Sequence, residues 1–475
     1  MRFLSQITEN SKRLLVYLCS IFILFGCANY EYIFEVEPSV DIPSSFSEES
    51  TQSKESEQGI SLEPWWVFFD RDDLNTMIDL SMDTNFEVKQ SIARLRQAQT
   101  LVIQTESERL PQISLEGDAG KAWEGSDPQQ GEVSIGGALQ WEIDAFNRIS
   151  SAVLADTFEV MARQEDLNAL RLSLSAEIAN AYFGAIAAHN TIDLLNRQVK
   201  TDLDLLELVE LRFEYGVGTT VEVLQQESRV ADSQSLIPLA MADLRNFENR
   251  LDVLIGEVPD GQNRVFESED LNFNQDLPNI GVPIDLLFNR PDLRAINNEL
   301  AAADADIASA IADRLPRITL DGSYGYSDSS EFSGPLAVIV GAFVQPLLDW
   351  GRRKAVVEQN KALYEERLAL FTQTYLEAVE DVENSLYQEN RQREFIERLE
   401  IRIDILEKTV EESEARYKQG IDDYLPVLNA LQELRIIQRD LVVERLNLVN
   451  QRIALFRAVG GPITYTEEEN TSETI

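Results

Sequence analysis

Side chains that could carry out chemistry are few in this 475-residue chain and do not form a recognisable set. The single histidine, His189, lies in an apolar stretch without a second histidine or a cysteine nearby, so a metal site or a nucleophilic pair is disfavoured. The segment Gly216-Val217-Gly218 lacks the strand and the further glycine of a dinucleotide-binding loop. We therefore expect no catalytic site, no bound metal and no cofactor, and the chain is not expected to be an enzyme.

The two cysteines, Cys19 and Cys27, both lie near the N-terminus, where the sequence has the layout of a secretion signal. A basic segment precedes an apolar run at 14–25 that is short for a membrane-spanning helix. The run ends Leu24-Phe25-Gly26-Cys27, which resembles a bacterial lipobox. We expect 1–26 to be a signal peptide, Cys27 to be the lipid attachment site, and Ala28 to favour the outer membrane. The alternative is that Cys27 simply follows an ordinary signal peptide.

The composition is strongly acidic, with a formal net charge of −42. Nucleic-acid binding requires a basic surface, and no basic cluster stands out, so nucleic acid is not an expected partner. An acidic lining in any enclosed space would attract cations and repel anions.

The chain repeats itself with a nearly constant register. The segment Arg109–Gly117 returns 205 residues later as Arg314–Gly322, and the segment Arg212–Val217 returns 204 residues later as Arg416–Ile421. This spacing is far longer than the 20–50 residues of solenoid repeats. It indicates one half-molecule built twice.

The repeat sets the expected domain layout. Each half is predicted to contain a helix, two strands, a long helix, a glycine-marked turn and another helix. The first helices are expected at about 74–109 and 285–315. The predicted segments are a tether at 27–60, repeat 1 at 61–256 with strands within 112–143, a linker at 257–283, repeat 2 at 284–461 with strands within 317–346, and an acidic tail at 462–475.

Alternating side chains in the predicted strands are typical of membrane β-strands, which have one apolar and one polar face. Four strands cannot close a transmembrane barrel, because the smallest known have eight, so several chains would have to share one. The helices are longer than globular helices and are expected to pack as coiled coils. A hairpin packed on helices and a soluble coiled coil are the alternatives.

Three motifs, in their order and duplicated spacing, resemble the TolC-type outer-membrane efflux proteins, in particular the lipoprotein branch (NodT- and OprM-like) that serves resistance-nodulation-division pumps. They are Arg290-Pro291-Asp292-Leu293-Arg294-Ala295, Gln345-Pro346-Leu347-Leu348-Asp349-Trp350-Gly351-Arg352 and Arg416-Tyr417-Lys418-Gln419-Gly420-Ile421. The resemblance implies a mainly α fold with a small β part. In a homotrimer, four strands per chain would make a 12-stranded outer-membrane barrel, and the long helices would make a periplasmic α-helical barrel.

The resemblance also implies the function. The chain would be a passive exit duct that receives substrates from a periplasmic adaptor and an inner-membrane pump, with outer-membrane lipid around its barrel. A duct for type I protein secretion and a periplasmic coiled-coil scaffold without a pore are the alternatives.

The resemblance places a gate at the hairpin tips, which are marked by Gly216, Gly218 and Gly420. It implies a bond between Glu222, six residues past the first-repeat glycine, and Tyr417, three before the second-repeat glycine. Where many members have a lumen-facing Asp, this chain has Asn429. The nearby Asp422 and Asp423 could supply an acidic constriction instead, and the alternative is that all these residues are merely solvated.

Overall fold

The computed structural model describes residues 30–33, 36–47, 64–121, 123–124, 127–128, 131–265, 271, 273, 281–328 and 333–461. The expected signal peptide, Cys27 and the acidic tail at 462–475 lie outside these residues. The chain forms two compact units. One contains the described residues within Met1–Glu37, Arg96–Ala162 and Ile296–Leu370, and the other those within Pro38–Leu95, Arg163–Ala295 and Phe371–Ile475.

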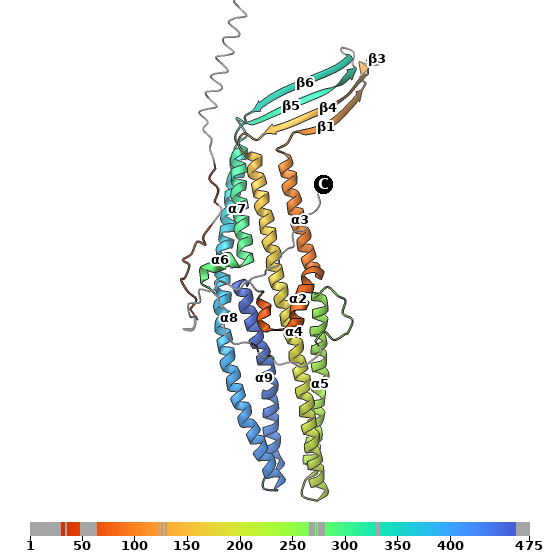
Figure 1. Cartoon of the computed structure of the whole chain (residues 1–475), viewed down its shortest axis with the longest axis vertical. Helices are drawn as coiled ribbons and strands as arrows, with labels where there is room; N and C mark the ends of the chain where they lie inside the picture. Colours follow the sequence, from red (N-terminus) through yellow and green to blue (C-terminus); the bar gives the residue numbers. More distant parts are fainter. Residues whose placement is uncertain are drawn as a thin grey trace, which may run out of the picture. The chain divides into compact units, whose positions relative to one another are not determined.

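The first unit contains an antiparallel sheet of four long strands (Figure 1). Their order is β1-β4-β5-β6, so β1 and β6 form the two edges. All four lie within the ranges 112–143 and 317–346 that the sequence predicted. Their bounds are Gln112–Gly120 for β1, Glu132–Ile143 for β4, Arg317–Asp328 for β5 and Ser333–Val344 for β6, and the two-residue strands β2 (Trp123–Glu124) and β3 (Asp127–Pro128) form a separate pair.

Two long helical hairpins follow the strands in sequence. Each begins with a helix of 67 residues and turns back at a glycine in the left-handed conformation, Gly216 (φ 73°) or Gly420 (φ 71°). Glycine suits these turns because it adopts positive φ without steric cost. The helices are α4 (Arg148–Glu214) with α5 (Thr220–Leu254), and α8 (Arg352–Lys418) with α9 (Tyr424–Val459).

The start of each half differs from the sequence prediction, because neither of its first helices is continuous. Repeat 1 has α2 (Asp72–Thr84) and α3 (Phe86–Ser107), separated by Asn85. The Asn85 Oδ1 accepts hydrogen bonds from the first amides of α3, at 2.7 Å from Glu87 N and 3.2 Å from Val88 N. Asparagine is a strong helix-capping residue, so it starts a new helix here. The remaining elements are η1 (Trp65–Phe69), η2 (Pro283–Asp285), α6 (Leu286–Asn289) and α7 (Pro291–Ala312).

The residues at the two breaks, Asn85 and Arg290, each form a hydrogen bond to the end of a long helix. Asn85 Nδ2 donates to the carbonyl of Leu254, at the end of α5, at 2.8 Å. Arg290, the repeat equivalent of Asn85, donates from Nη1 to the carbonyl of Ala458, at the end of α9, at 3.2 Å. Each side chain thereby satisfies a carbonyl that a helix end leaves without an intrahelical partner. The duplication in the sequence is therefore also a duplication of tertiary contacts.

Gly184 is the one glycine in α4, and its place is explained by a ring on α5. A β-carbon at this position would overlap the aromatic ring of Phe247. Glycine inside a helix normally costs about 0.5–1 kcal/mol relative to alanine, so its use here indicates close helix packing.

We expect Gly184→Ala to lower the free energy of unfolding by about 1–3 kcal/mol through overpacking, instead of raising it as it would in an open helix. The midpoint of thermal unfolding, followed by circular dichroism, measures the effect. Adding Phe247→Leu should recover part of the loss. A stabilised Gly184→Ala variant would contradict this packing.

The described part of the expected tether contacts helices. In the first unit, Tyr30 Oη donates to Asp304 at 2.6 Å and Ile33 N donates to the same carboxylate at 2.9 Å. In the second unit, Ser47 donates to Glu383 from both its amide, at 2.7 Å, and its hydroxyl, at 2.6 Å. Residues 30–33 and 36–47 are therefore held on the protein surface at two places.

None of the helices in the described part of the chain has an apolar stretch of the length needed to cross a bilayer.

Candidate functional site

The turn between α4 and α5 positions the first predicted gate residue. The amides of Val217 and Gly218 both donate to the carbonyl of Arg212, at 2.9 and 3.0 Å, and close the end of α4. Thr219 then caps α5 in a reciprocal arrangement with Glu222, which holds the Glu222 carboxylate beside the turn. A β-carbon at Gly218 would be crowded, because it would lie 3.0 Å from the backbone nitrogen of Phe213 and 3.3 Å from the Glu222 carboxylate.

The two hairpins meet at a cluster that we call the tip latch, made of Arg212, Glu222 and Tyr417. The Tyr417 hydroxyl donates to Glu222 Oε2 at 3.2 Å. Arg212 Nη1 donates to the Tyr417 carbonyl at 2.8 Å, and its guanidinium lies 4.3 Å from the centre of the Tyr417 ring. The two residues that the family resemblance paired, Glu222 and Tyr417, are therefore in contact, while Arg212 was not predicted.

Burial and the negative charge of Glu222 raise the pKa of Tyr417 to about 12. Tyr417 is only 1% exposed, so its hydroxyl remains protonated and available as a donor at neutral pH. The latch is therefore a hydrogen bond to a carboxylate, which is stronger than a bond between neutral groups.

A second polar cluster lies inside the hairpins, and we call it the core network. Asp202 of α4 forms an ion pair with Arg435 of α9, with Nη1 at 2.5 Å from Oδ1. Its other oxygen accepts from Ser233 Oγ of α5 at 2.7 Å. Gln226 of α5 donates to the Asp202 carbonyl at 2.7 Å and accepts from the hydroxyl of Tyr424 on α9. All five side chains are buried, so the network joins α4 and α5 to α9 in a place that water does not reach.

Sequence reasoning missed the core network, although a signal was present. The buried positions of α4 recur at alternating steps of three and four residues, as Leu195, Gln198, Asp202, Leu205 and Val209. This spacing is the seam of a coiled coil, and a charged residue within such a seam must be paired. Its partner could not be read from the sequence, because Arg435 lies on a helix of the other repeat.

The other predicted site residues, Asp422, Asp423 and Asn429, lie at the turn between α8 and α9 or on the first turns of α9. Arg416 Nε donates a hydrogen bond to Asp422 Oδ2 at 2.5 Å, and this bond lowers the pKa of Asp422. Asp423 is the residue before α9 and is exposed, and Asn429 is exposed on α9. Asp422 is therefore charge-compensated, so that of the three residues predicted to line the constriction Asp423 and Asn429 are the exposed ones.

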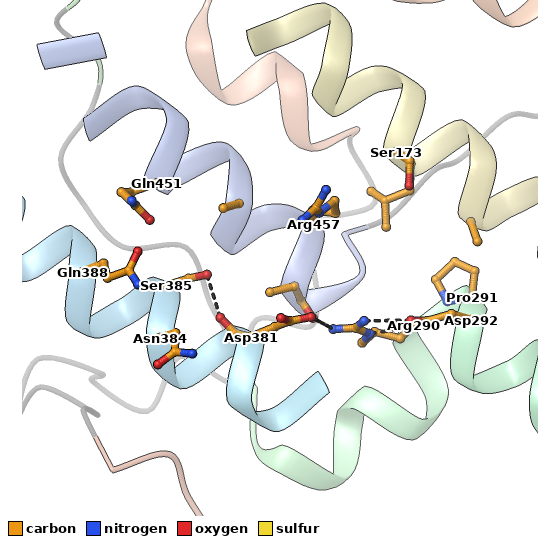
Figure 2. A pocket seen from close by; sticks show the side chains of 14 residues that line it. Ser173, Arg290, Pro291, Asp292, Asp381, Asn384, Ser385, Gln388, Gln451 and Arg457 are labelled. Atoms are coloured by element: carbon orange, nitrogen blue, oxygen red, sulfur yellow. Dashed lines mark hydrogen bonds and ion pairs between the residues drawn. The ribbon is translucent and has the colours of Figure 1, made fainter. Parts of the chain in front are cut away.

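Two further polar contacts connect distant parts of the chain. His189 Nε2 on α4 lies 2.9 Å from the carbonyl of Val265, and this contact attaches the segment after α5 to α4. Figure 2 shows a pocket in which Arg290 lies between two carboxylates, 2.7 Å from Asp292 and 3.1 Å from Asp381. Among the described residues, no group of three or more His, Cys, Asp or Glu is placed to hold a metal ion.

Comparison with known proteins identifies relatives in the outer membrane. The model of the outer membrane efflux protein family matches residues 77–257 and 282–461, one segment in each repeat. The chain is 27% identical to a pyoverdine export outer membrane protein, OpmQ, of Pseudomonas putida, over 85% of this chain and 89% of that protein. It is 23% identical to a probable outer membrane lipoprotein, SilC, of Salmonella typhimurium, over 94% and 98%.

The fold is also that of a solved channel. The structure of the outer-membrane channel OprN superimposes with a TM-score of 0.81 at 25% sequence identity, covering 90% of this chain and 99% of that one. The mainly helical fold with a small antiparallel sheet is therefore confirmed.

Proposed function

The chain belongs to the outer membrane efflux protein family, and from this premise we propose that it is the exit duct of a tripartite efflux system, gated at the ends of its two helical hairpins. It passively conducts substrates that an inner-membrane pump of the resistance-nodulation-division class and a periplasmic adaptor deliver. The observation that carries the gate is the tip latch, in which Tyr417 of one hairpin is hydrogen-bonded to Glu222 of the other.

The pore wall in the outer membrane needs several copies of the chain, because the four strands of the described sheet are too few to close a membrane barrel. The resemblance to the family implies three copies, which supply twelve strands. Apolar side chains on the sheet support a lipid-facing surface, since Ile113, Leu115 and Ile339 are each about 80% exposed in the single chain. The long helices of the three copies form the wall of the duct in the periplasm.

The gate opens when the hairpins move apart at their ends. The tip latch, in which the buried Tyr417 hydroxyl is bonded to the partly exposed Glu222 carboxylate, is the contact that breaks on opening. The core network is buried and charged, so breaking it would cost far more, and α4, α5 and α9 stay joined there. Asp423 and Asn429 are the side chains proposed to border the constriction.

Cys27 is proposed to carry a lipid that anchors the chain in the outer membrane. The Salmonella relative SilC is a probable outer membrane lipoprotein, and its similarity to this chain extends over 94% of this chain and 98% of that protein. In this chain, Tyr30 lies three residues after Cys27 and is hydrogen-bonded to Asp304 on α7. A lipid on Cys27 would therefore be attached next to a fixed point of the first unit.

The test is the accumulation of a fluorescent cationic dye in cells that lack the gene, with and without a plasmid copy. We expect the dye to build up several-fold in the deletion strain and the plasmid copy to reverse it. Unchanged accumulation, together with an absence of conductance by the purified protein in planar bilayers, would favour the scaffold alternative. Conductance without dye export would favour protein secretion.

Two neighbouring glycines give matched variants for this assay. A β-carbon at Gly136 would lie 2.7 Å from the Cα of Gly325 on the paired strand, whereas at Gly137 the nearest atom is 3.8 Å away. Gly136→Val should therefore disturb the pairing of β4 with β5 and fail to complement, and Gly137→Val should complement. Complementation by both would argue against a role for the sheet in transport.

A further inference from the structure

Strand β6 is apolar on both of its faces, which distinguishes it from the other three long strands of the sheet (Figure 1). A membrane β-strand normally alternates between apolar side chains toward lipid and polar side chains toward the pore. One face of β6 carries Ala337, Ile339 and Phe343. The other face carries a second apolar row, which we call the β6 stripe and which consists of Leu336, Val338, Val340, Ala342 and Val344.

The pairing of the strands shows that the β6 stripe does not lie on the lipid-facing surface. Ile339 lies opposite Gly322 on β5, which lies opposite Leu139 on β4, and Leu139 lies opposite Ile113 on β1. Directly opposite side chains share a face of the sheet. Ile113 and Ile339 are 79% and 80% exposed and belong to the surface assigned to lipid. The β6 stripe lies on the other face, which is the pore face of the proposed duct.

The β6 stripe is accessible on that face. Leu336 and Val340 are each 50% exposed, Val338 is 40% exposed and Val344 is 58% exposed. Closing a sheet into a barrel joins the edges of its strands and leaves the two faces uncovered. Contiguous exposed apolar side chains are typical of binding surfaces. The closed barrel would therefore still present the β6 stripe to its interior.

The repeat relates β6 to β4 residue by residue. Gly117 pairs with Ile135 in repeat 1, and Gly322 pairs with Ile339 in repeat 2. The second strands of the two repeats are thus related by the offset of 204 residues that also relates Arg212 to Arg416.

This relation provides an internal comparison for the β6 stripe. At the equivalent positions, the pore face of β4 carries polar or small residues, namely Glu132, Ser134, Gly136, Ala138 and Gln140. The strand therefore does not need apolar side chains at these positions in order to form. The apolar side chains of β6 indicate a role that β4 does not have.

A carboxylate lies beside the middle of the β6 stripe. Val340 is directly opposite Asp321 on β5. Their β-carbons are therefore about 4.5–5.5 Å apart and on the same face. The Asp321 carboxylate accepts a hydrogen bond from Thr319 Oγ1 at 3.2 Å. An acidic group and an apolar surface are thus presented side by side.

The charges on the rest of the pore face favour a cation. The exposed acids Glu116, Asp118 and Glu132 occupy pore-face positions of β1 and β4. Among the described residues of the four long strands, Arg317 is the basic side chain on this face, and it is ion-paired with Asp313. A face lined by carboxylates attracts cations and repels anions.

We propose that the β6 stripe and Asp321 form a binding site for organic cations that have an apolar body, and that this site makes the membrane part of the duct prefer them to hydrophilic cations of the same charge. The charged group of such a cation would lie near Asp321, and its body would cover Val338 and Val340. The inference rests on the proposed duct, because only there does this face line a pore. It adds a site and a class of ligand.

Block of the potassium current through the purified full-length protein in planar bilayers tests the site. Tetraphenylphosphonium and tetramethylammonium carry the same charge and differ in apolar surface. We expect tetraphenylphosphonium to reach half-block at about tenfold lower concentration or less, because its rings would remove apolar surface of the β6 stripe from water.

The double variant Val338→Thr with Val340→Thr removes the apolar contact and keeps the β-branched side chains that suit a strand. It should raise the half-block concentration of tetraphenylphosphonium about three- to tenfold, since two methyl groups are lost from the contact, and leave that of tetramethylammonium unchanged. Asp321→Asn should weaken block by both probes. If the double variant does not conduct potassium, Val340→Thr alone provides the same test.

The matched control is Val133→Thr. Val133 is 56% exposed on β4 and lies on the lipid-facing surface, because it is opposite Asp328, whose side chain is on the same face as Gly322. This variant should change neither half-block concentration.

Equal half-block concentrations of the two probes would overturn the site, and so would unchanged block in a double variant that conducts potassium. In both cases the duct would stand. An equal loss of block in Val133→Thr would overturn the assignment of the β6 stripe to the pore. An absence of potassium conductance in the wild-type protein would overturn the duct and the site together.

Discussion

Replacing Asp202 by alanine is expected to lower the free energy of unfolding of the hairpins by about 3–5 kcal/mol, because it leaves the buried Arg435 guanidinium without its carboxylate. The variant also removes the acceptor of Ser233. The effect should be local, so hydrogen exchange of the amides in α9 should accelerate before the protein unfolds globally. Thermal unfolding followed by circular dichroism measures the total loss.

Two controls make this prediction specific. Asp404→Ala removes the acid of an exposed ion pair, whose Lys408 Nζ lies 2.6 Å from the carboxylate, and should cost at most about 1 kcal/mol. The double variant Asp202→Leu with Arg435→Met should recover most of the stability, since replacing a buried ion pair by apolar residues is often neutral. Equal effects of Asp202→Ala and Asp404→Ala would show that the core network contributes nothing.

Removing the Tyr417 hydroxyl is expected to raise the fraction of time that a single channel is open about 10–100-fold. A hydrogen bond to a charged group contributes about 1.5–3 kcal/mol, and each 1.4 kcal/mol changes an equilibrium tenfold. Tyr417→Phe keeps the ring that packs against Arg212 and, at 5.6 Å between ring centres, against Tyr424. Single-channel recordings in planar bilayers measure the open fraction.

The control for this experiment is Tyr387→Phe, on an exposed part of α8, which should leave the open fraction unchanged. An unchanged open fraction in Tyr417→Phe would mean that the tip latch does not hold the gate.

The pH dependence provides an additional check on the Tyr417→Phe experiment. The pKa of Tyr417 is raised from 10 to about 12, so the latch is complete below about pH 10 and is lost as the pH rises through 12. The wild-type open fraction should therefore be constant from pH 6 to 9 and rise above pH 10. The Tyr417→Phe variant should lack that rise.

The helix boundary at Asn85 could have been predicted from the repeat. A helix from about 74 to 109 was expected because no proline or glycine interrupts it. Yet Pro291 marks a helix start in the second half, and its equivalent in the first half is Phe86, where α3 begins. Comparing the two repeats therefore indicates a helix boundary that the local sequence of the first repeat does not show. The exact role of Asn85, bonding to the end of α5, depends on a contact with a distant part of the chain.

The sequence by itself determined the duplicated half-molecule, its strands, its long helices and the glycine turns, because these follow from local periodicity and from residues with special backbone freedom. The resemblance to the family added the pairing of Glu222 with Tyr417 at the two tips. Only the tertiary structure revealed Arg212 against the Tyr417 ring and Asp202 paired with Arg435. The members of each pair lie in different repeats, and which of the many acids on the helices is buried depends on how the helices of both hairpins pack, which no local pattern encodes.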